Sequence, residues 1–150
     1  MNKKNIAVLG AGKMGLGIAQ LFATKGHQVK VIYVYDDKIR CDAAAVVRDN
    51  LSVLVENDVM TQQEADAAAA RISFVDTIEE VADFADVVFE GIIEKLEIKQ
   101  DYFAKMDAIF PVSTILATNT SAISITEIAE KSVHKERIIG THYWNPAYLV

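Results

Sequence analysis

The sequence predicts an α/β domain built on a doubly wound, mainly parallel sheet with helices on both faces. Short, almost wholly apolar segments of strand type alternate with longer amphipathic segments of helix type along the 150 residues. A glycine-rich turn joins the first strand pattern to the first helix pattern. No internal repeat or low-complexity stretch breaks this alternation, so successive strands should be joined by right-handed crossovers.

The expected strands are apolar on consecutive residues, as is typical of strands that are covered on both faces. Gly10 ends the first strand. The second begins at Val29 and is closed by Asp36 and Asp37, which can also open the next helix. The strands are expected at residues 5–9, 29–34, 72–75, 87–89, 114–117 and 138–141.

The expected helices follow apolar positions three and four residues apart. The first carries Ile18 and Phe22 on one stripe, and Gly26 ends it. Thr61 and Glu64 have the spacing of a capping box at the start of an alanine-rich helix. The first helix is expected at residues 14–25, and the others at 43–55, 77–84, 94–109 and 124–130.

The composition argues against several kinds of partner. The formal net charge is −6 and no run of Lys or Arg forms a stripe, so no nucleic-acid partner is expected. No apolar stretch approaches the roughly 20 residues of a membrane span. The single cysteine, Cys41, cannot form an internal disulfide, and no Cys and His set has metal-ligand spacing, so no metal is expected. The N-terminal residues run into a strand without an apolar signal segment, which predicts a cytoplasmic protein.

The turn from Gly10 to Gly15 has the pattern G-x-G-x-x-G between a strand and a helix. Gly10 permits the tight turn, Gly12 lets the backbone approach a pyrophosphate, and Gly15 lets the helix pack close to the strand. These glycines, with Lys13 and Met14, are the expected contacts of a dinucleotide at the helix N-terminus. The alternative is an ordinary turn between a strand and a helix.

Asp36 is the candidate for binding the adenosine ribose. It lies 21 residues after Gly15, where an acid at the end of the second strand can accept from the ribose hydroxyls. An acid at this place repels a 2′-phosphate, so the expected cofactor is NAD rather than NADP. Alternatively, Asp36 and Asp37 only cap the next helix.

Four blocks are more specific than the glycine turn alone: GAGKMGLGIAQ at residues 10–20, VVFEGIIEKLEIKQ at 87–100, ATNTSAISITEIA at 117–129 and GTHYWNP at 140–146. With these blocks, essentially the whole chain resembles the N-terminal domain of the 3-hydroxyacyl-CoA dehydrogenases. The resemblance implies a Rossmann domain followed by a helical domain that holds two subunits together. It also implies a small-molecule substrate and the reversible oxidation, by NAD, of a 3-hydroxyacyl group to a 3-oxoacyl group.

The resemblance further implies roles for individual residues. His142 would be the general base, Ser121 would hydrogen-bond the substrate oxygen, and Asn145 would help to align substrate and nicotinamide. Glu94 and Lys99 match residues that contact the cofactor. Imidazole suits the proton transfer because its ordinary pKa, about 6.5, lies near neutral pH. Without the family context, a lone histidine after a buried strand is more often a structural residue.

The sequence departs from the family pattern at the end of the chain and at the second strand. The family pairs its histidine with a glutamate that would lie beyond Val150, and its helical domain would also lie there. We therefore expect residues 1–150 to be the NAD-binding domain of a homodimeric protein of roughly twice this length, with little or no turnover alone. The family's ribose-binding aspartate aligns with Tyr33, three residues before Asp36.

The substrate positions depart as well. The family's CoA-contacting serine and lysine align near Asn50 and Asn57, and Tyr143 and Trp144 replace two phenylalanines. A dehydrogenase of a free small 3-hydroxy acid, similar to those for carnitine or gulonate, therefore stays open beside acyl-CoA. A non-catalytic NAD-binding or structural relative is the third alternative. Glu90 follows a buried strand, and it either faces the cofactor crevice or caps a loop.

Overall fold

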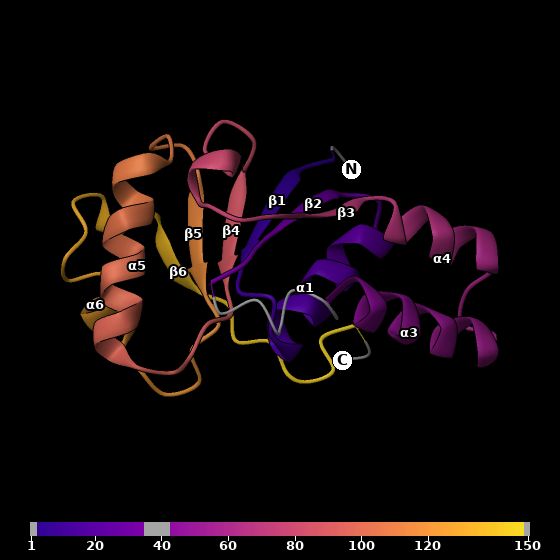
Figure 1. Cartoon of the computed structure of the whole chain (residues 1–150). Coiled ribbons are helices and arrows are strands. Elements are labelled where there is room, and N and C mark those ends of the chain that lie inside the picture. The colour runs from indigo at the N-terminus through magenta and orange to yellow at the C-terminus, as the bar shows by residue number, and fades with distance from the viewer. Residues whose placement is uncertain (1–2, 35–42, 149–150) are drawn as a thin grey trace.

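The computed structural model describes residues 3–34 and 43–148 (Figure 1). Its strands are β1 (Asn5–Leu9), β2 (Gln28–Ile32), β3 (Ile72–Val75), β4 (Val87–Glu90), β5 (Ile115–Thr118) and β6 (Ile138–Gly140). Its α-helices are α1 (Lys13–Thr24), α3 (Ala43–Glu56), α4 (Gln62–Ala69), α5 (Leu96–Ile109) and α6 (Ile125–Ile128). Two short 3-10 helices, η1 (Glu79–Val81) and η2 (Lys135–Arg137), precede β4 and β6.

Within the described residues, the strands form one all-parallel sheet in the order β3-β2-β1-β4-β5-β6. The chain builds one half outward from β1 and then returns to build the other half from β4. The register pairs Leu9 with Glu90, and Glu90 with Thr118, so that these strands end along one edge. In such doubly wound sheets, the crevice for a ligand opens at this edge, where the strand order reverses. The predicted fold class is confirmed.

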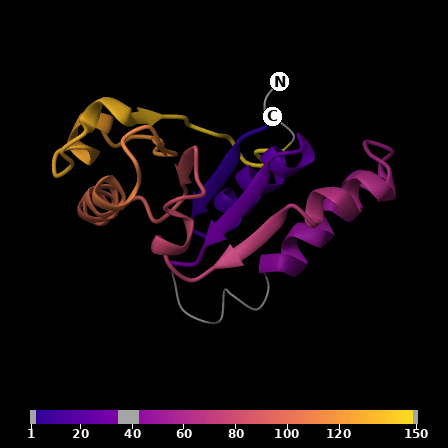
Figure 2. The same ribbon diagram turned by 90° about the horizontal axis from the view of Figure 1, so that it is seen from above.

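Two separate cores lie on the two faces of the sheet, because successive side chains of a strand point to opposite sides. Ile6 and Val8 of β1 pack with side chains of α1, α3 and α4. Ala7 and Leu9 pack with side chains of α5 and α6. Figure 2 shows α3 and α4 side by side, far from α5.

The prediction of a helix at residues 77–84 is wrong. This stretch forms only the single turn η1. Glu80 Oε1 accepts from the backbone N–H groups of Asp76 and Thr77 at 3.0 and 2.9 Å. The side chain thereby caps one tight turn, and β4 begins six residues after this turn ends.

Other elements agree with the expectation apart from their ends. β2 ends at Ile32 rather than at residue 34. α5 begins at Leu96 rather than at Glu94, because Glu94 lies in the preceding turn and binds the loop after β5. The capping box is present: the Thr61 hydroxyl accepts from Glu64 N at 3.2 Å, and the Glu64 carboxylate accepts from Thr61 N at 2.8 Å.

Candidate functional site

At Gly10 and Gly15, neighbouring backbone atoms lie too close to leave room for a side chain. Gly10 has a φ of +105°, and a Cβ there would lie 2.9 Å from the carbonyl oxygen of Gly91. A Cβ on Gly15 would lie 1.9 Å from the carbonyl oxygen of Gly10. Both positions therefore require glycine, one for its backbone conformation and both for the close approach of backbone segments.

Gly12 serves a different purpose, because a Cβ there would meet no atom within 4 Å. The residue is the extended N-cap of α1, and no side chain caps the helix. The first turn of α1 also lacks an acidic residue. The space around Gly12 at the N-terminus of α1 is therefore open, and no side chain caps the positive end of the helix dipole there, which fits a dinucleotide phosphate.

A hollow of about 570 Å³ adjoins this turn. Gly12 and Lys13 line it on one side, and Ala43 and Asn50 of α3 line it on another. Asp36, the candidate for the ribose, lies outside the described residues, as does Cys41. Tyr33, at the aligned position, stacks on Phe74 of β3 with ring centroids 5.5 Å apart.

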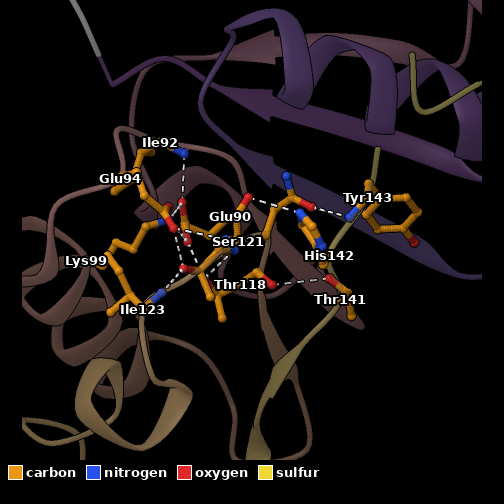
Figure 3. Close-up of polar contacts among 12 residues, drawn as sticks. Glu90, Ile92, Glu94, Lys99, Thr118, Ser121, Ile123, Thr141, His142 and Tyr143 are labelled. Atoms are coloured by element: carbon orange, nitrogen blue, oxygen red, sulfur yellow. Dashed lines mark hydrogen bonds and ion pairs between the residues drawn. The ribbon is translucent and has the colours of Figure 1, made fainter. Parts of the chain in front are cut away.

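Ser121 and His142 come together from the loops after β5 and β6 (Figure 3). Ser121 Oγ lies 2.9 Å from His142 Nε2. Two further contacts hold this geometry. Thr141 N donates to the carbonyl oxygen of Thr118, the last residue of β5, at 2.9 Å, and Tyr143 N donates to Asn119 Oδ1 at 2.6 Å. No local sequence pattern predicts these two contacts, because they depend on how the loops lie in space.

Ser121 and His142 line a hollow of about 280 Å³ together with Met14 and Asn145. Met14 brings the first turn of α1 to the wall of this hollow. Asn145 also lines the larger hollow beside Gly12, so this residue borders both hollows. The three residues predicted to be catalytic therefore lie together, next to the glycine turn.

Glu94 supports the loop that carries Ser121. Its Oε1 accepts from Ser121 N at 3.0 Å and from the Thr120 hydroxyl, and its Oε2 lies 3.1 Å from Lys99 Nζ. Burial raises the pKa of Glu94, but the hydrogen bonds from Thr120, Lys99 and Ser121 outweigh it and hold the pKa below its ordinary value. Glu94 is therefore a carboxylate at neutral pH.

Lys99 lies beneath this loop with only 1% of its surface exposed. Its ammonium group contacts both oxygens of Glu90 at 2.7 Å as well as Glu94. Lys99 therefore lies between two carboxylates, and its shortest contacts in the described structure are those with Glu90. Direct contact of Lys99 with a cofactor stays a prediction.

Glu90 fits both roles that its sequence position suggests. It lines a hollow of about 210 Å³ with Met14, Glu94 and Ser121. Its Oε1 also accepts from Ile92 N at 2.7 Å, as a loop cap would. The sequence signal was a carboxylate at the end of a buried strand, which is costly unless it is paired. The partner, Lys99 in the first turn of α5, does not follow from the sequence pattern.

The comparisons with known proteins agree with this geometry. The profile of the family described as "3-hydroxyacyl-CoA dehydrogenase, NAD binding domain" matches residues 5–150. The chain is 37% identical to 3-hydroxyadipyl-CoA dehydrogenase of Escherichia coli (strain K12), with 98% of this chain and 30% of that protein covered. It is 40% identical to a probable 3-hydroxybutyryl-CoA dehydrogenase of Bacillus subtilis (strain 168), with 97% and 50% covered.

A solved structure is similar over the same range. The crystal structure of 3-hydroxybutyryl-CoA dehydrogenase from Escherichia coli K12 has a TM-score of 0.91 and 36% identity, with 99% of this chain and 31% of that one covered. The chain thus spans half or less of the length of these relatives. Residues 3–34 and 43–148 include no helix that is long and apolar enough to cross a membrane. The chain belongs to the family of 3-hydroxyacyl-CoA dehydrogenase NAD-binding domains, and its cofactor is NAD.

Proposed function

We propose that the full-length protein oxidises a 3-hydroxyacyl-CoA reversibly to the 3-oxoacyl-CoA, and that residues 1–150 form its NAD-binding domain. The observation that carries the proposal is the 2.9 Å contact between Ser121 Oγ and His142 Nε2. This contact lies in a hollow whose wall includes Met14 of the glycine turn. A proton acceptor, a hydroxyl donor and a dinucleotide site are therefore next to one another.

The residues divide the chemistry between them. His142 accepts the proton of the substrate hydroxyl at Nε2 as general base. Ser121 Oγ donates a hydrogen bond to the same substrate oxygen, whose charge changes in the reaction. Asn145 borders both hollows and orients the substrate between them. NAD supplies the acceptor for the hydride that leaves the carbinol carbon. The phosphates of NAD would be held by the glycine turn, that is by Gly10, Gly12, Lys13, Met14 and Gly15. Asp36 would contact the adenosine end of NAD, and Glu94 would contact the nicotinamide end.

The relatives favour a CoA thioester as substrate, since the similar proteins of Escherichia coli and Bacillus subtilis are named as dehydrogenases of hydroxyacyl-CoA compounds. The hollow of about 570 Å³ next to Asn145 offers room for a chain that leads away from the reacting carbon. Its walls include apolar Leu16, Val46 and Pro146. Such walls suit the acyl or pantetheine part of a thioester.

A free small 3-hydroxy acid is the second candidate, and the charges around this hollow favour it. Lys13 is the one cation among the residues described as lining it. Arg48, the basic residue of α3, lines a different hollow together with Asp49 and Asp66. Because Lys13 is already assigned to the phosphates of NAD, no second cation among the described lining residues is left for the several phosphate charges of CoA, which a free 3-hydroxy acid lacks.

The test uses the full-length protein with NAD and two substrate classes, 3-hydroxyacyl-CoA thioesters and free 3-hydroxy acids. We expect NADH formation with the thioesters, and a loss of about 10²- to 10⁴-fold in kcat for His142→Ala with unchanged NAD affinity. Turnover of free acids alone would select the second candidate. NAD binding without turnover of either class would show a binding protein and refute the proposal.

The proposal extends to the assembly and its compartment. We propose a homodimer formed through the helical domain outside these residues, because the family pairs its subunits in that way. We also propose a cytoplasmic location, supported by a sequence with one cysteine and no disulfide framework. Light scattering on the full-length protein and cell fractionation test these two points, and a monomer or a membrane-bound fraction would contradict them.

A further inference from the structure

Glu90 is a buried carboxylate that no step of the proposed reaction uses. It ends β4 with no exposed surface, beside Ser121 (Figure 3). Its two oxygens accept four hydrogen bonds, two from Lys99 Nζ, one from Ile92 N and one from Thr118 Oγ1, each 2.7 Å long. A carboxylate with this many donors is held in one position.

The ammonium group of Lys99 is divided unequally between its two acidic neighbours. It contacts both oxygens of Glu90 at 2.7 Å but a single oxygen of Glu94 at 3.1 Å. Lys99 and Glu90 are both buried, whereas 42% of the Glu94 side chain is exposed. The charge of Lys99 is therefore balanced mainly by Glu90, and Glu94 keeps most of its negative charge.

This negative charge faces the hollow of about 210 Å³ beside the catalytic pair. Three residues line both this hollow and the one that contains His142. They are Met14, Asn119 and Ser121. Under the proposed function, on which this step rests, the reactive ring of NAD must lie within contact distance of a substrate held at His142. It must therefore lie beside these shared residues, with Glu94 on the adjoining wall.

We propose that Glu90 is a positioning residue that sets the preference of the site for oxidised over reduced NAD. By taking up the charge of Lys99, it leaves one net negative charge, that of Glu94, near the nicotinamide ring. The oxidised ring is a cation and the reduced ring is neutral, so this charge stabilises only the oxidised form. One unit charge several ångströms from the ring in a partly solvated site corresponds to roughly a three- to tenfold difference in affinity.

A purely structural role for Glu90 predicts something else. In that case the carboxylate only satisfies the buried donors of Lys99, Ile92 and Thr118. Its replacement would loosen the Ser121 loop and weaken NAD⁺ and NADH by the same factor. The ratio of the two dissociation constants therefore separates the two roles, and it requires no turnover.

The experiment measures the dissociation constants of NAD⁺ and NADH for the full-length protein by calorimetry. Glu90→Gln removes one negative charge while it keeps the shape of the side chain, and Glu94→Gln removes the charge that faces the ring. We expect both variants to raise the ratio Kd(NAD⁺)/Kd(NADH) by roughly three- to tenfold. Glu97→Gln, on the exposed part of α5, is the matched control and should leave the ratio unchanged.

A double variant covers the case in which Glu90→Gln fails to fold, because it leaves a buried lysine without its main partner. Glu90→Gln with Lys99→Met removes the buried pair as a unit and keeps the net charge of the cluster. It should therefore keep the ratio Kd(NAD⁺)/Kd(NADH) of the unmodified protein, even where the loss of Lys99 weakens the binding of both forms. An unchanged ratio in Glu94→Gln, or a raised ratio in the double variant, would overturn the inference. These outcomes differ from a failure of the proposed function, which would appear as absent turnover in the unmodified protein.

Discussion

The side chains of Ser121 and His142 meet at 2.9 Å although each follows a different strand of the sheet. Their loops are joined by backbone contacts of Thr141 and Tyr143, so the pair does not depend on its own hydrogen bond for its position. Glu94 likewise binds the backbone N–H of Ser121 rather than its hydroxyl. Because these backbone contacts hold the loop, the Ser121 hydroxyl, which contacts His142, can be removed without displacing the loop.

Ser121→Ala in the full-length protein should lower kcat by about 10²-fold, the effect of losing one donor to the reacting oxygen. The affinity for NAD⁺ should stay unchanged, because the alanine keeps the N–H that binds Glu94. Steady-state kinetics and calorimetry measure the two quantities. Ser113→Ala, at an exposed position before β5, is the control. An equal loss in both variants would contradict a role for the Ser121 hydroxyl.

Gly12→Ser should separate stability from cofactor binding. The serine finds open space at a helix N-cap, where its side chain is preferred over glycine, so stability should rise by a few tenths of a kcal/mol. The same side chain would occupy the N-terminal amides of α1, and NAD⁺ affinity should fall by about tenfold or more. Denaturant unfolding and calorimetry provide the readouts. Retained affinity would mean that these amides do not bind the phosphate.

Gly15→Ala should have the opposite balance, because the new Cβ would lie 1.9 Å from the carbonyl oxygen of Gly10. Relief of this overlap requires α1 to move away from β1, at a cost of about 1–3 kcal/mol or more. The variant should therefore unfold at a lower denaturant concentration than Gly12→Ser. Equal midpoints for the two variants would show that the helix is not packed as closely as described.

Asp107 should make stability depend on acid. It is buried against Arg137, with contacts of 2.7 and 2.9 Å, and accepts from the N–H groups of Val133 and His134. Burial raises the pKa of Asp107, but the His134 N–H, the Arg137 guanidinium and the Val133 N–H outweigh it and hold the pKa below its ordinary value. A lowered pKa in the folded state adds stability above the unfolded pKa, and this is lost as the pH falls through the folded one.

Asp107→Asn should therefore lower the free energy of unfolding by about 3–5 kcal/mol at neutral pH, since the buried guanidinium loses its charged partner. The difference from the unmodified protein should shrink as the pH falls below about 4, the ordinary pKa of an aspartate in the unfolded chain, towards the lower pKa of Asp107 in the folded protein. Denaturant titrations across this pH range test the expectation. A difference that does not vary with pH would exclude the carboxylate charge as its cause.

The sequence predicted the features that depend on local pattern. The glycine turn, the strand positions and the Thr61 capping box follow from residue type and spacing, and the structure confirms them. The resemblance to a family selected Ser121 and His142, which no local pattern would have paired. The structure then brings them within hydrogen-bond distance.

The features that the sequence did not predict depend on long-range placement. The partner of Glu90 could be named only once β4 and α5 were positioned, because eight residues of turn and helix lie between it and Lys99. The contact of Tyr143 N with Asn119 joins two loops across the sheet edge. The prediction of a helix at residues 77–84 was wrong because the Glu80 side chain caps a tight turn there. The spacing of apolar residues does not reveal such a cap.

The position of β6 has a consequence for how the protein loses function on warming. This three-residue strand lies at the margin of the described sheet, with β5 as its neighbour, and it carries the chain into His142. The glycine turn, by contrast, follows β1 at the sheet centre. Local unfolding should begin at such margins. On heating, proton transfer by His142 should therefore be lost while the dinucleotide is still bound, and activity should be lost below the melting temperature.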